Sequence, residues 1–426
     1  MLERFKVPKK DRVYVEEQKV RLVTEKVFVH LGLSQDAAKI NADVLITNDL
    51  RGVESHGVSN GLRRYVGEYT NKELNPNPKF SILRESPTTL TIDADSALGT
   101  HVGPWAMQKA IDKAKEFGIG AVAVTNSGHL AGCGYYAMMA ADQGMIGHCM
   151  TAGGALNTVP TFGSKPLLGT NPIAWAAPAK SMPYFLFDIA TSQVAGNKIT
   201  LAKRTGAKLE PGWISDTNGN PVMEEVHPPE KYHLLHIGGT RENGSHKGYS
   251  LGLMNEIICN ELSGWGPGPV HKNNGGHFFQ AYDIDAFTDK TKFLSDMDDL
   301  LEHIINVPPS EGHERVIYAG LEEQEEVLKR SKEGIPYHKE VINWFETYCE
   351  ESNIDCDLRQ SFLDWHLPFC IFASSLSSIL SSARNNMHTL INFVTYIFCC
   401  GSSKKIFSIF FTCFLNSFSS LYDSRI

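Results

Sequence analysis

The sequence predicts an α/β protein in which a helical N-terminal part precedes a domain built on a mixed β-sheet. Three observations support this prediction. Apolar residues recur at helical spacing through most of the first eighty residues. From residue 86 onward, short apolar runs alternate with helical patterns, as in a sheet that helices cover. No GxGxxG motif follows a strand pattern, so the sheet is not expected to be a Rossmann domain.

The helical part is expected to span residues 11–85. Ser34 is placed to cap a helix, and Asp36 lies in its first turn, where a negative charge is favourable. The NPNP sequence at 75–78 cannot continue a helix. The expected helices of this part cover residues 14–31, 35–50 and 58–69.

The α/β domain is predicted for residues 86–285. Its expected strands are 88–93, 119–125, 145–151, 173–177 and 184–188. One expected helix has Pro104 near its start and runs to residue 118. Three further helices are expected over 131–143, 194–206 and 247–262. Helical patterns return within residues 286–350, and we expect them to pack against the N-terminal part.

Composition and charge limit the class of protein. The net charge is −8, and no dense stripe of Lys and Arg is present, so no nucleic-acid partner is expected. The first residues lack the apolar core of a secretory signal, which predicts a cytoplasmic protein. Five cysteines are scattered without metal-binding spacing, which favours reduced thiols: Cys133, Cys149, Cys259, Cys349 and Cys356.

Residues 361–426 have a different composition from the rest of the chain. Charges become sparse, and Phe, Ser, Cys and Ile dominate. The apolar runs at 390–400 and 406–418 are each shorter than the roughly 20 residues of a membrane-spanning helix. We therefore expect this hydrophobic tail neither to anchor the protein in a membrane nor to contribute to the fold. No membrane span is expected in the main body of the chain either.

The segment RGVESHGVSN, residues 51–60, is the first candidate functional site. His56 lies between a serine and a glycine at the start of a helix, and imidazole exchanges protons near neutral pH. Gly57 permits close backbone approach, and Ser55 can hydrogen-bond the ring. On this segment alone, a surface histidine in a helix–helix turn is an equally good interpretation.

A second histidine lies in TNSGHLAGCGYYAMMA, residues 125–140. His129 follows an apolar strand, a favoured location for active sites in open α/β sheets. Glycines on both sides leave its ring uncovered, which favours a functional role over packing. Tyr135 offers a hydroxyl to a bound oxygen, although a packed aromatic pair with Tyr136 is the alternative.

Three further segments are candidates for binding an anionic ligand. In FDIATSQVAGNK (187–198), Asp188 ends a strand, and the small residues after it are expected to open a helix with free N–H groups. Lys247 in SHKGYSLG stands near another helix start, and a solvated lysine is the alternative. Gly312 lies in a turn expected between a helix and a strand.

Together these segments resemble the malate/L-lactate dehydrogenase family that lacks a Rossmann fold, which includes ureidoglycolate and sulfolactate dehydrogenases. The resemblance covers roughly residues 11–350. Six ordered motifs are more specific than any one of them. They are RGVESHG (51–57), NSGH (126–129), GTNPIA (169–174), FDIATSQVAGNK (187–198), SHKGYSLG (245–252) and IDAFTD (284–289).

The resemblance implies hydride transfer between NAD or NADP and a small 2-hydroxy or 2-oxo acid. It also implies a homodimer whose non-Rossmann α/β domain binds the dinucleotide. By this similarity His56 and His129 match the family's two histidines, one or the other of which is the proton donor in different members. We expect His56 to transfer the proton and His129 to orient the substrate or stabilise an oxyanion, and the opposite assignment stays open. The implied cofactor-binding residues are Thr170, Asn171, Asp188, Ala190, Thr191, Ser192, Lys247, Gly248 and Gly312.

The substrate site departs from the family pattern. Many members have an arginine four residues after the first histidine, and this chain has Asn60 there. A substrate carboxylate needs a guanidinium partner, and Arg63 or Arg64 can replace the missing one. Ser55 and Tyr135 complete the expected substrate contacts.

Three alternatives remain open at this point. The first alternative is an imino-acid reductase of the same family. The second is a metal-dependent hydrolase that uses His56, His129 and Asp188. The third, which Asn60 suggests, is a catalytically silent homologue with a binding role. The hydrolase is disfavoured because no two of its ligands have zinc-type spacing, and no metal site is predicted.

Overall fold

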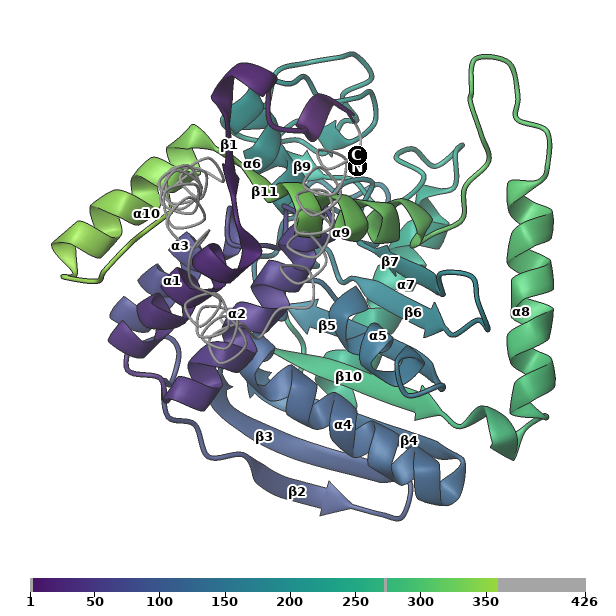
Figure 1. The fold of residues 1–426 in the computed structure, drawn as a ribbon. Helices are drawn as coiled ribbons and strands as arrows, with labels where there is room; N and C mark the ends of the chain where they lie inside the picture. The colour runs from purple at the N-terminus through teal and green to yellow at the C-terminus, as the bar shows by residue number, and fades with distance from the viewer. Residues whose placement is uncertain (1–2, 272–273, 359–426) are drawn as a thin grey trace, which may run out of the picture. The chain divides into compact units, whose positions relative to one another are not determined.

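A computed structural model describes residues 3–271 and 274–358, and within them a seven-stranded sheet forms the centre of the protein (Figure 1). The strand order is β2-β3-β4-β10-β5-β6-β7. Within this sheet β3 and β4 pair in parallel, and the other neighbours are antiparallel. The bounds are β2 Ser81–Glu85, β3 Thr89–Ala97, β4 Ile119–Ser127, β5 Ile146–Gly153, β6 Ile173–Ala177, β7 Phe185–Ile189 and β10 Gly275–Tyr282. The predicted α/β class with a mixed sheet is confirmed.

Helices cover both faces of this sheet (Figure 1). The covering helices are α4 (Gly99–Phe117) and α5 (Gly134–Ala141) on one face, and α7 (Ser245–Glu256) with the π-helical turn η3 (Ile257–Glu261) on the other. Glycines permit the close contact. A Cβ on Gly120 would lie 2.0 Å from the Ala110 carbonyl oxygen, and one on Gly276 would lie 1.9 Å from that of Cys259.

The N-terminal helices form as the sequence predicts. They are α1 (Glu17–His30), α2 (Gln35–Leu50) and α3 (Gly61–Thr70). The Ser34 hydroxyl accepts a hydrogen bond from the Ala37 N–H at 3.2 Å, which confirms the expected cap. Buried Val20 and Val27 belong to the same hydrophobic cluster as Phe279 of the central strand, so the helices and the sheet share one core.

The C-terminal elements divide between two places. Strand β11 (Ile335–His338) pairs with β1 (Arg12–Val15), and α9 (Leu321–Glu333) lies against α2. Helix α8 (Lys290–Ile305) instead lies beyond the ends of the strands, beside the turn that joins β6 to β7 (Figure 1). There its Asp298 carboxylate accepts backbone N–H groups of Lys180, Ser181 and Met182. The last helix is α10 (Lys339–Glu351).

One expectation about this part is wrong. The turn that contains Gly312 does not lead into a strand, because the next described element is helix α9. The proposed division of the chain into residues 11–85 with 286–350 and residues 86–285 stays a prediction. The predicted tail, 361–426, lies outside the described residues.

A smaller hydrophobic cluster lies beside the sheet. It contains Phe5, Ile199, Leu209 and Leu234. Its elements are α6 (Gly196–Thr205) and the strand pair β8 (Ile214–Ser215) and β9 (His233–Leu234). The remaining short helices are η1 (Glu3–Phe5), η2 (Lys9–Asp11) and η4 (Ile284–Ala286).

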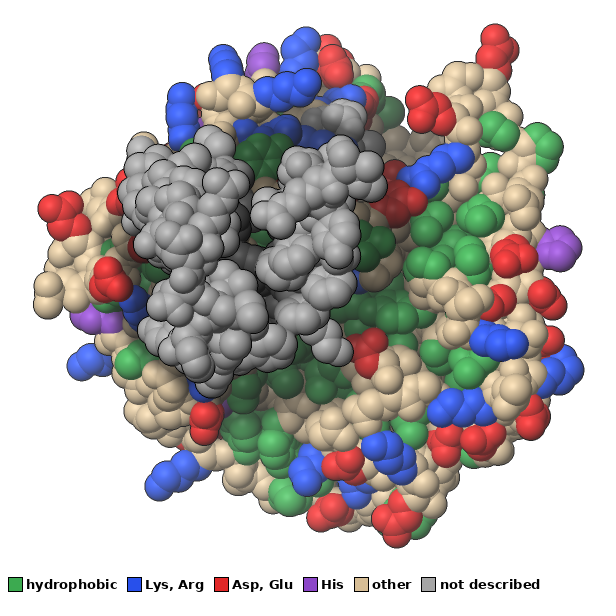
Figure 2. Space-filling view, viewed as in Figure 1, with side chains coloured by type: hydrophobic (Ala, Val, Ile, Leu, Met, Phe, Trp, Pro, Cys, Tyr) green, Lys and Arg blue, Asp and Glu red, His purple; other side chains and the backbone are tan. Residues whose placement is uncertain are grey.

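The surface shows no strong bias of charge on the face drawn in Figure 2, where acidic and basic side chains are interspersed around α4 and β2. Among the described residues, no helix combines the length and hydrophobicity that crossing a membrane requires. The five described cysteines are free thiols, as expected.

Candidate active site

A cavity of about 270 Å³ opens where the ends of β4 and β5 meet the start of β10. Three histidines line it: His56, His129 and His277. Its other lining residues include Arg64, Thr151, Asn157, Thr170, Asn171 and Asn197. Many of the rest are glycine or alanine, which leave room for a ligand against the backbone.

The two histidines singled out in the sequence lie side by side in this cavity. The ring centroids of His56 and His129 are 6.0 Å apart, and the ring planes differ by 18°. They come from loops 73 positions apart, between α2 and α3 and between β4 and α5. The fold thus brings together the two imidazoles on which the predicted chemistry depends.

His56 is held by a single side-chain hydrogen bond to its ring. The Ser55 hydroxyl lies 2.8 Å from His56 Nδ1, and the Ser55 carbonyl accepts from the Asn197 amide at 2.7 Å. Burial lowers the pKa of His56 to about 4, and the positive charges of Lys198 and Arg64 contribute to the same shift. The ring is therefore neutral near pH 7 and able to accept a proton.

His129 is held more firmly. Its Nδ1 lies 2.7 Å from the Tyr65 hydroxyl and 3.4 Å from the Ala131 backbone N–H. A backbone N–H can only donate, so Nδ1 is an acceptor and the neutral ring carries its proton on Nε2. Burial lowers the pKa of His129 well below its usual value, with Arg64 and His56 adding to the shift. His129 is thus a neutral ring with Nε2–H as its free donor.

The NSGH turn that carries His129 has a strained backbone. Asn126 adopts a left-handed φ of 56°, and its side chain donates to Asp93 and accepts from Ser96. A Cβ on Gly128 would lie 2.6 Å from the Leu74 side chain. Since Asn tolerates this conformation and only Gly fits beside Leu74, the motif is explained by backbone geometry.

His277 is a cavity residue that the sequence analysis missed. It is 1% exposed, and its Nε2 lies 3.1 Å from the Gly128 carbonyl while Nδ1 lies 2.7 Å from the Thr151 hydroxyl. The carbonyl can only accept, so Nε2 carries the proton and His277 holds the peptide that precedes His129. Burial lowers the pKa of His277 to about 4. The available signal was the aromatic run after two glycines, GGHFFQAY.

The expected arginines have different positions. Arg64 lines the cavity, and its Nε donates to Glu68 at 2.6 Å. Arg63 does not line it, because its guanidinium pairs with Glu340 at 2.6 Å and lies over the Trp344 ring. The amide of Asn60, the residue at the family's arginine position, donates to the Asn197 carbonyl. Of the two arginines, the structure brings only Arg64 to the site.

Tyr135, another expected substrate contact, lies outside the cavity lining. Its hydroxyl donates to the Asp43 carboxylate at 2.6 Å. The tyrosine that reaches a catalytic candidate is Tyr65, through its contact with His129. Burial raises the pKa of Tyr65 above its usual range, so its hydroxyl keeps its proton at physiological pH.

Two of the expected cofactor residues, Thr170 and Asn171, line the cavity. Asn171 Nδ2 donates to the Gly252 carbonyl and to the buried Glu256 carboxylate, which fixes the orientation of the amide. Among the described residues, neither its Oδ1 nor Oδ1 of Asn157 in the same cavity has a hydrogen-bond partner, and both oxygens are buried. Two amides of the cavity wall therefore have unused hydrogen-bonding capacity.

The segment after β7 differs from its prediction. Helix α6 begins at Gly196, so Thr191 and Ser192 are not at a helix start. The Thr191 N–H donates to the Thr170 carbonyl, and the Ser192 hydroxyl donates to the Val194 carbonyl. The expectation of free N–H groups here is wrong for Thr191, because this stretch pairs with neighbouring backbone. The helix start that lines the cavity is Gly196–Asn197.

The other expected cofactor residues lie outside the cavity lining. Asp188 accepts the Gly134 N–H at 2.7 Å, and Ala190 follows it at the end of β7. Lys247 is exposed on the first turn of α7. A Cβ on Gly248 would lie 2.3 Å from the Ile237 carbonyl, and one on Gly312 would meet no atom within 4 Å.

The hydrolase alternative is not supported by the positions of its residues. It requires His56, His129 and Asp188 to surround one ion, yet Asp188 binds the Gly134 N–H. Across residues 3–271 and 274–358, no three His, Cys, Asp or Glu side chains are grouped to hold a metal.

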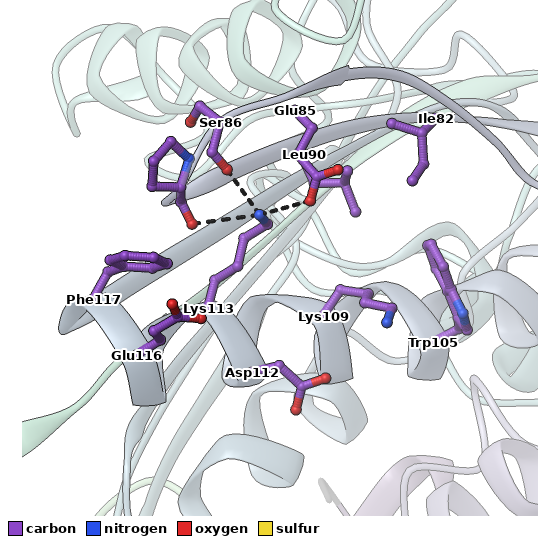
Figure 3. Close-up of a pocket in the computed structure, with 11 residues that line it drawn as sticks. Ile82, Glu85, Ser86, Leu90, Trp105, Lys109, Asp112, Lys113, Glu116 and Phe117 are labelled. Carbon is purple, nitrogen blue, oxygen red and sulfur yellow. Dashed lines mark hydrogen bonds and ion pairs between the residues drawn. The ribbon is translucent and has the colours of Figure 1, made fainter.

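A larger groove of about 490 Å³ lies between the β2–β3 hairpin and α4, away from the histidines (Figure 3). Lys113 crosses it and donates to the Glu85 carboxylate at 3.0 Å and the Ser86 carbonyl at 2.8 Å. Trp105 and Phe117 line its apolar side. Because the lysine is already paired within the groove, the histidine cavity is the better candidate active site.

The chain belongs to the malate/L-lactate dehydrogenase family, whose model matches residues 15–346. It is 40% identical over 349 residues to a malate dehydrogenase of Pyrococcus abyssi, covering 78% of this chain and 95% of the relative. It is 34% identical over 353 residues to an L-sulfolactate dehydrogenase of Methanocaldococcus jannaschii, covering 80% and 97%.

Solved structures agree with this assignment. The crystal structure of malate dehydrogenase from Entamoeba histolytica matches with a TM-score of 0.77 and 31% identity, over 81% of this chain and 99% of that one. Malate dehydrogenase from Pyrococcus horikoshii matches with a TM-score of 0.74 and 34% identity, over 83% and 99%. The resemblance seen in the sequence motifs is confirmed, and the chain is an oxidoreductase of the hydroxy-acid type.

Proposed function

We propose that this chain transfers a hydride between NAD or NADP and C2 of a small 2-hydroxy or 2-oxo acid, of the malate or sulfolactate type. The named relatives act on such acids. The observation that carries the proposal is the pair of neutral imidazoles, His56 and His129, stacked in one cavity. One ring is fixed as a donor, and the other is free to change tautomer.

The cavity fits a nicotinamide. When bound, the nicotinamide supplies or accepts the hydride. The unpartnered Asn157 and Asn171 oxygens suit the NH₂ of its carboxamide, and the α6 start at Gly196 suits an anionic group of the dinucleotide. We propose that Thr170 and Asn171, which line the cavity, contact the dinucleotide. The other residues that the resemblance implies lie outside the lining, and their assignment stays a prediction: Asp188, Ala190, Thr191, Ser192, Lys247, Gly248 and Gly312.

His129 serves as the oxygen-binding donor in this proposal. Its Nδ1 accepts the Ala131 N–H, so Nε2–H is available to the carbonyl oxygen of an oxo acid. The same bond strengthens when that oxygen becomes an alkoxide, because charge-assisted hydrogen bonds are stronger than neutral ones. His129 thereby stabilises the transition state without changing its own protonation.

His56 serves as the proton carrier. The Ser55 hydroxyl can donate to Nδ1 or accept from it, so either tautomer of His56 is stable. In the oxidative direction the neutral ring accepts the hydroxyl proton. In the reductive direction the substrate's negative charge favours the imidazolium, which then protonates the alkoxide.

Arg64 is the proposed partner of the substrate carboxylate. Ser55 supports the His56 ring through its hydroxyl group. Arg64 lines the cavity and lowers the pKa values of both His56 and His129 through its charge. A bound carboxylate would offset this charge and restore basicity to His56. Arg63 and Tyr135 are already paired outside the cavity, so we leave them out of the substrate site.

A substrate panel tests the proposal. Malate, lactate, sulfolactate, ureidoglycolate and a cyclic imino acid are each assayed with both cofactors by the absorbance of the reduced nicotinamide. We expect turnover of malate or sulfolactate. Turnover of the imino acid alone would show the reductase alternative. No turnover with any acid, by a folded protein that still binds nucleotide, would show a silent homologue.

We also propose that the protein is a cytoplasmic homodimer. Large apolar side chains stay exposed on and after α7, where Ile257 is 50% and Leu262 is 59% exposed, and a second copy would cover them. The free thiols suit a reducing compartment. Light scattering on the purified protein tests the dimer, and a monomer at micromolar concentration would contradict it.

A further inference from the structure

The loop that carries His56 rests on a buried carboxylate. Asp49 lies in the last turn of α2, is 0% exposed, and directs its side chain back under the loop. Its Oδ2 accepts the Val58 N–H at 2.9 Å and the Tyr337 hydroxyl at 2.8 Å. Tyr337 lies on β11, 288 positions away in the sequence. This oxygen therefore joins the loop to the C-terminal part of the chain.

The other carboxylate oxygen lies against Gly57. A Cβ at Gly57 would lie 1.8 Å from Asp49 Oδ1, so only glycine fits there. Oδ1 has no hydrogen-bond partner. His56 is the residue immediately before Gly57, so its backbone position depends directly on where this carboxylate sits.

Arg330 of α9 contacts both the end of α2 and the loop that carries His56. It is 4% exposed, donates to the Asp49 carbonyl at 2.8 Å, and pairs with Glu54 at 3.0 Å. Its Nε pairs with Glu326 on its own helix. Gly52 packs on the guanidinium, where a Cβ would lie 3.4 Å from Nη2. Contacts with Asp49 and α9 thus explain Glu54 and Gly57 of the RGVESHG motif, whereas Gly52 is explained by its left-handed φ of 75°.

The groups that face Asp49 carry opposing charges. Glu54 comes from the loop, Arg330 and Glu326 from α9, and Tyr337 from β11. Burial raises the pKa of Asp49 to about 7, Glu54 adds to this, and the bonds from Val58 and Tyr337 with the charge of Arg330 oppose it.

We propose that Asp49 is a positioning residue, whose buried carboxyl group anchors the loop that presents His56 to the substrate. Its Oδ2 accepts two donors at once, and an oxygen with two lone pairs can do so in either protonation state. Because burial raises the pKa of Asp49, the anchored loop holds this proton more tightly than an opened loop would, in which the carboxyl group meets water. Ionisation of Asp49 as pH rises through about 7 therefore loosens the loop and moves His56 from its working position.

Kinetics at varied pH give the first test, which rests on the proposed function. Activity that depends on the anchored loop should be present below the Asp49 ionisation and fall as pH rises through about 7. Asp49→Asn keeps an oxygen acceptor without a charge, so it should keep the activity seen at low pH and remove this limb. Tyr337→Phe removes a bond that favours the ionised form, which should move the limb to higher pH.

Tyr318→Phe is the matched control. Tyr318 is also buried, and its hydroxyl donates to the Pro183 carbonyl, away from the loop. Tyr318→Phe should leave the pH midpoint of the activity profile the same as in the parent protein. A loss of activity with rising pH that persists unchanged in both Asp49→Asn and Tyr337→Phe would overturn the proposal.

Hydrogen exchange gives a second test that needs no turnover. Peptides covering residues 51–60 are followed by mass spectrometry at about pH 6 and about pH 8, corrected for the chemical exchange rate. In the parent protein the loop should lose protection at the higher pH, where Asp49 ionises. In Asp49→Asn the difference should disappear. Equal protection at both pH values in the parent protein would overturn the anchor, whereas pH-dependent protection without turnover would overturn only the proposed function.

Discussion

The two histidines of the cavity are held by different kinds of structure. His129 is fixed through its ring, by a tyrosine hydroxyl and a backbone N–H on the same nitrogen. The His56 ring accepts or donates a hydrogen bond at the adjacent Ser55, and His56 is fixed through its loop by Asp49 and Arg330 beneath it. One ring cannot change tautomer easily, whereas the other can.

This difference matches the needs of the proposed reaction. An oxyanion donor works best when its proton is fixed in place before the reaction, because no reorganisation is then needed. A proton carrier must gain and lose its proton in every cycle, which a rotatable hydroxyl beside the ring allows. The contrast between His56 and His129 therefore supports the two proposed roles on physical grounds.

The largest expected effect separates the two roles directly. His56→Ala should lower kcat by about 10²–10⁴-fold, because general acid–base catalysis is lost, and should leave nucleotide affinity nearly intact. His129→Gln keeps a donor and should retain more activity than His56→Gln. Steady-state kinetics and nucleotide titration measure both. Equal losses of turnover and nucleotide affinity in His56→Ala would show a structural role instead.

A smaller but still large effect is expected at Gly57. Gly57→Ala places a Cβ into the Asp49 carboxylate, so the loop must move and kcat should fall about 10²-fold. Gly67→Ala is the matched control, since its Cβ would meet nothing within 4 Å. In the middle of α3 this control should stabilise the fold by up to about 1 kcal/mol, measured by thermal unfolding. Equal activity in the two variants would contradict the anchored loop.

The two adjacent arginines provide a third comparison. Arg64→Gln should lower kcat/KM for the acid about 10–100-fold, mainly through KM, because a charge-assisted contact is lost. Arg63→Gln removes an exposed pair with Glu340 and should change KM little and stability by no more than about 1 kcal/mol. A larger kinetic effect at Arg63 than at Arg64 would place the substrate carboxylate elsewhere.

Local patterns were sufficient to predict most elements of the described fold. The helix over 35–50 and the strand over 173–177 agree residue for residue, because capping and apolar periodicity are local properties. Strand β10 was missed although it is central. Its less buried face carries the aromatic residues Phe278 and Tyr282, so GGHFFQAY lacks the alternation of apolar and polar residues that marks a half-exposed strand. With β10, the sequence analysis also missed His277.

The site could be predicted only in part. His56 and His129 were found because glycines beside a histidine are a local signal. Asp49 could not be found in this way, since its partners Arg330 and Tyr337 are 281 and 288 positions away. Three-dimensional contacts between distant positions leave no periodicity in a single sequence.

The smallest expected effect tests how firmly His129 is held. Tyr65→Phe removes the hydroxyl from Nδ1 but leaves the Ala131 N–H, so the ring keeps its tautomer through a weaker set of contacts. A lost hydrogen bond of about 1 kcal/mol predicts a fall in kcat of about fivefold, with an unchanged pH profile. A new ionisation in the profile would show that His129 has begun to exchange its proton. That result would make the two histidines alike and remove the basis for giving them different roles.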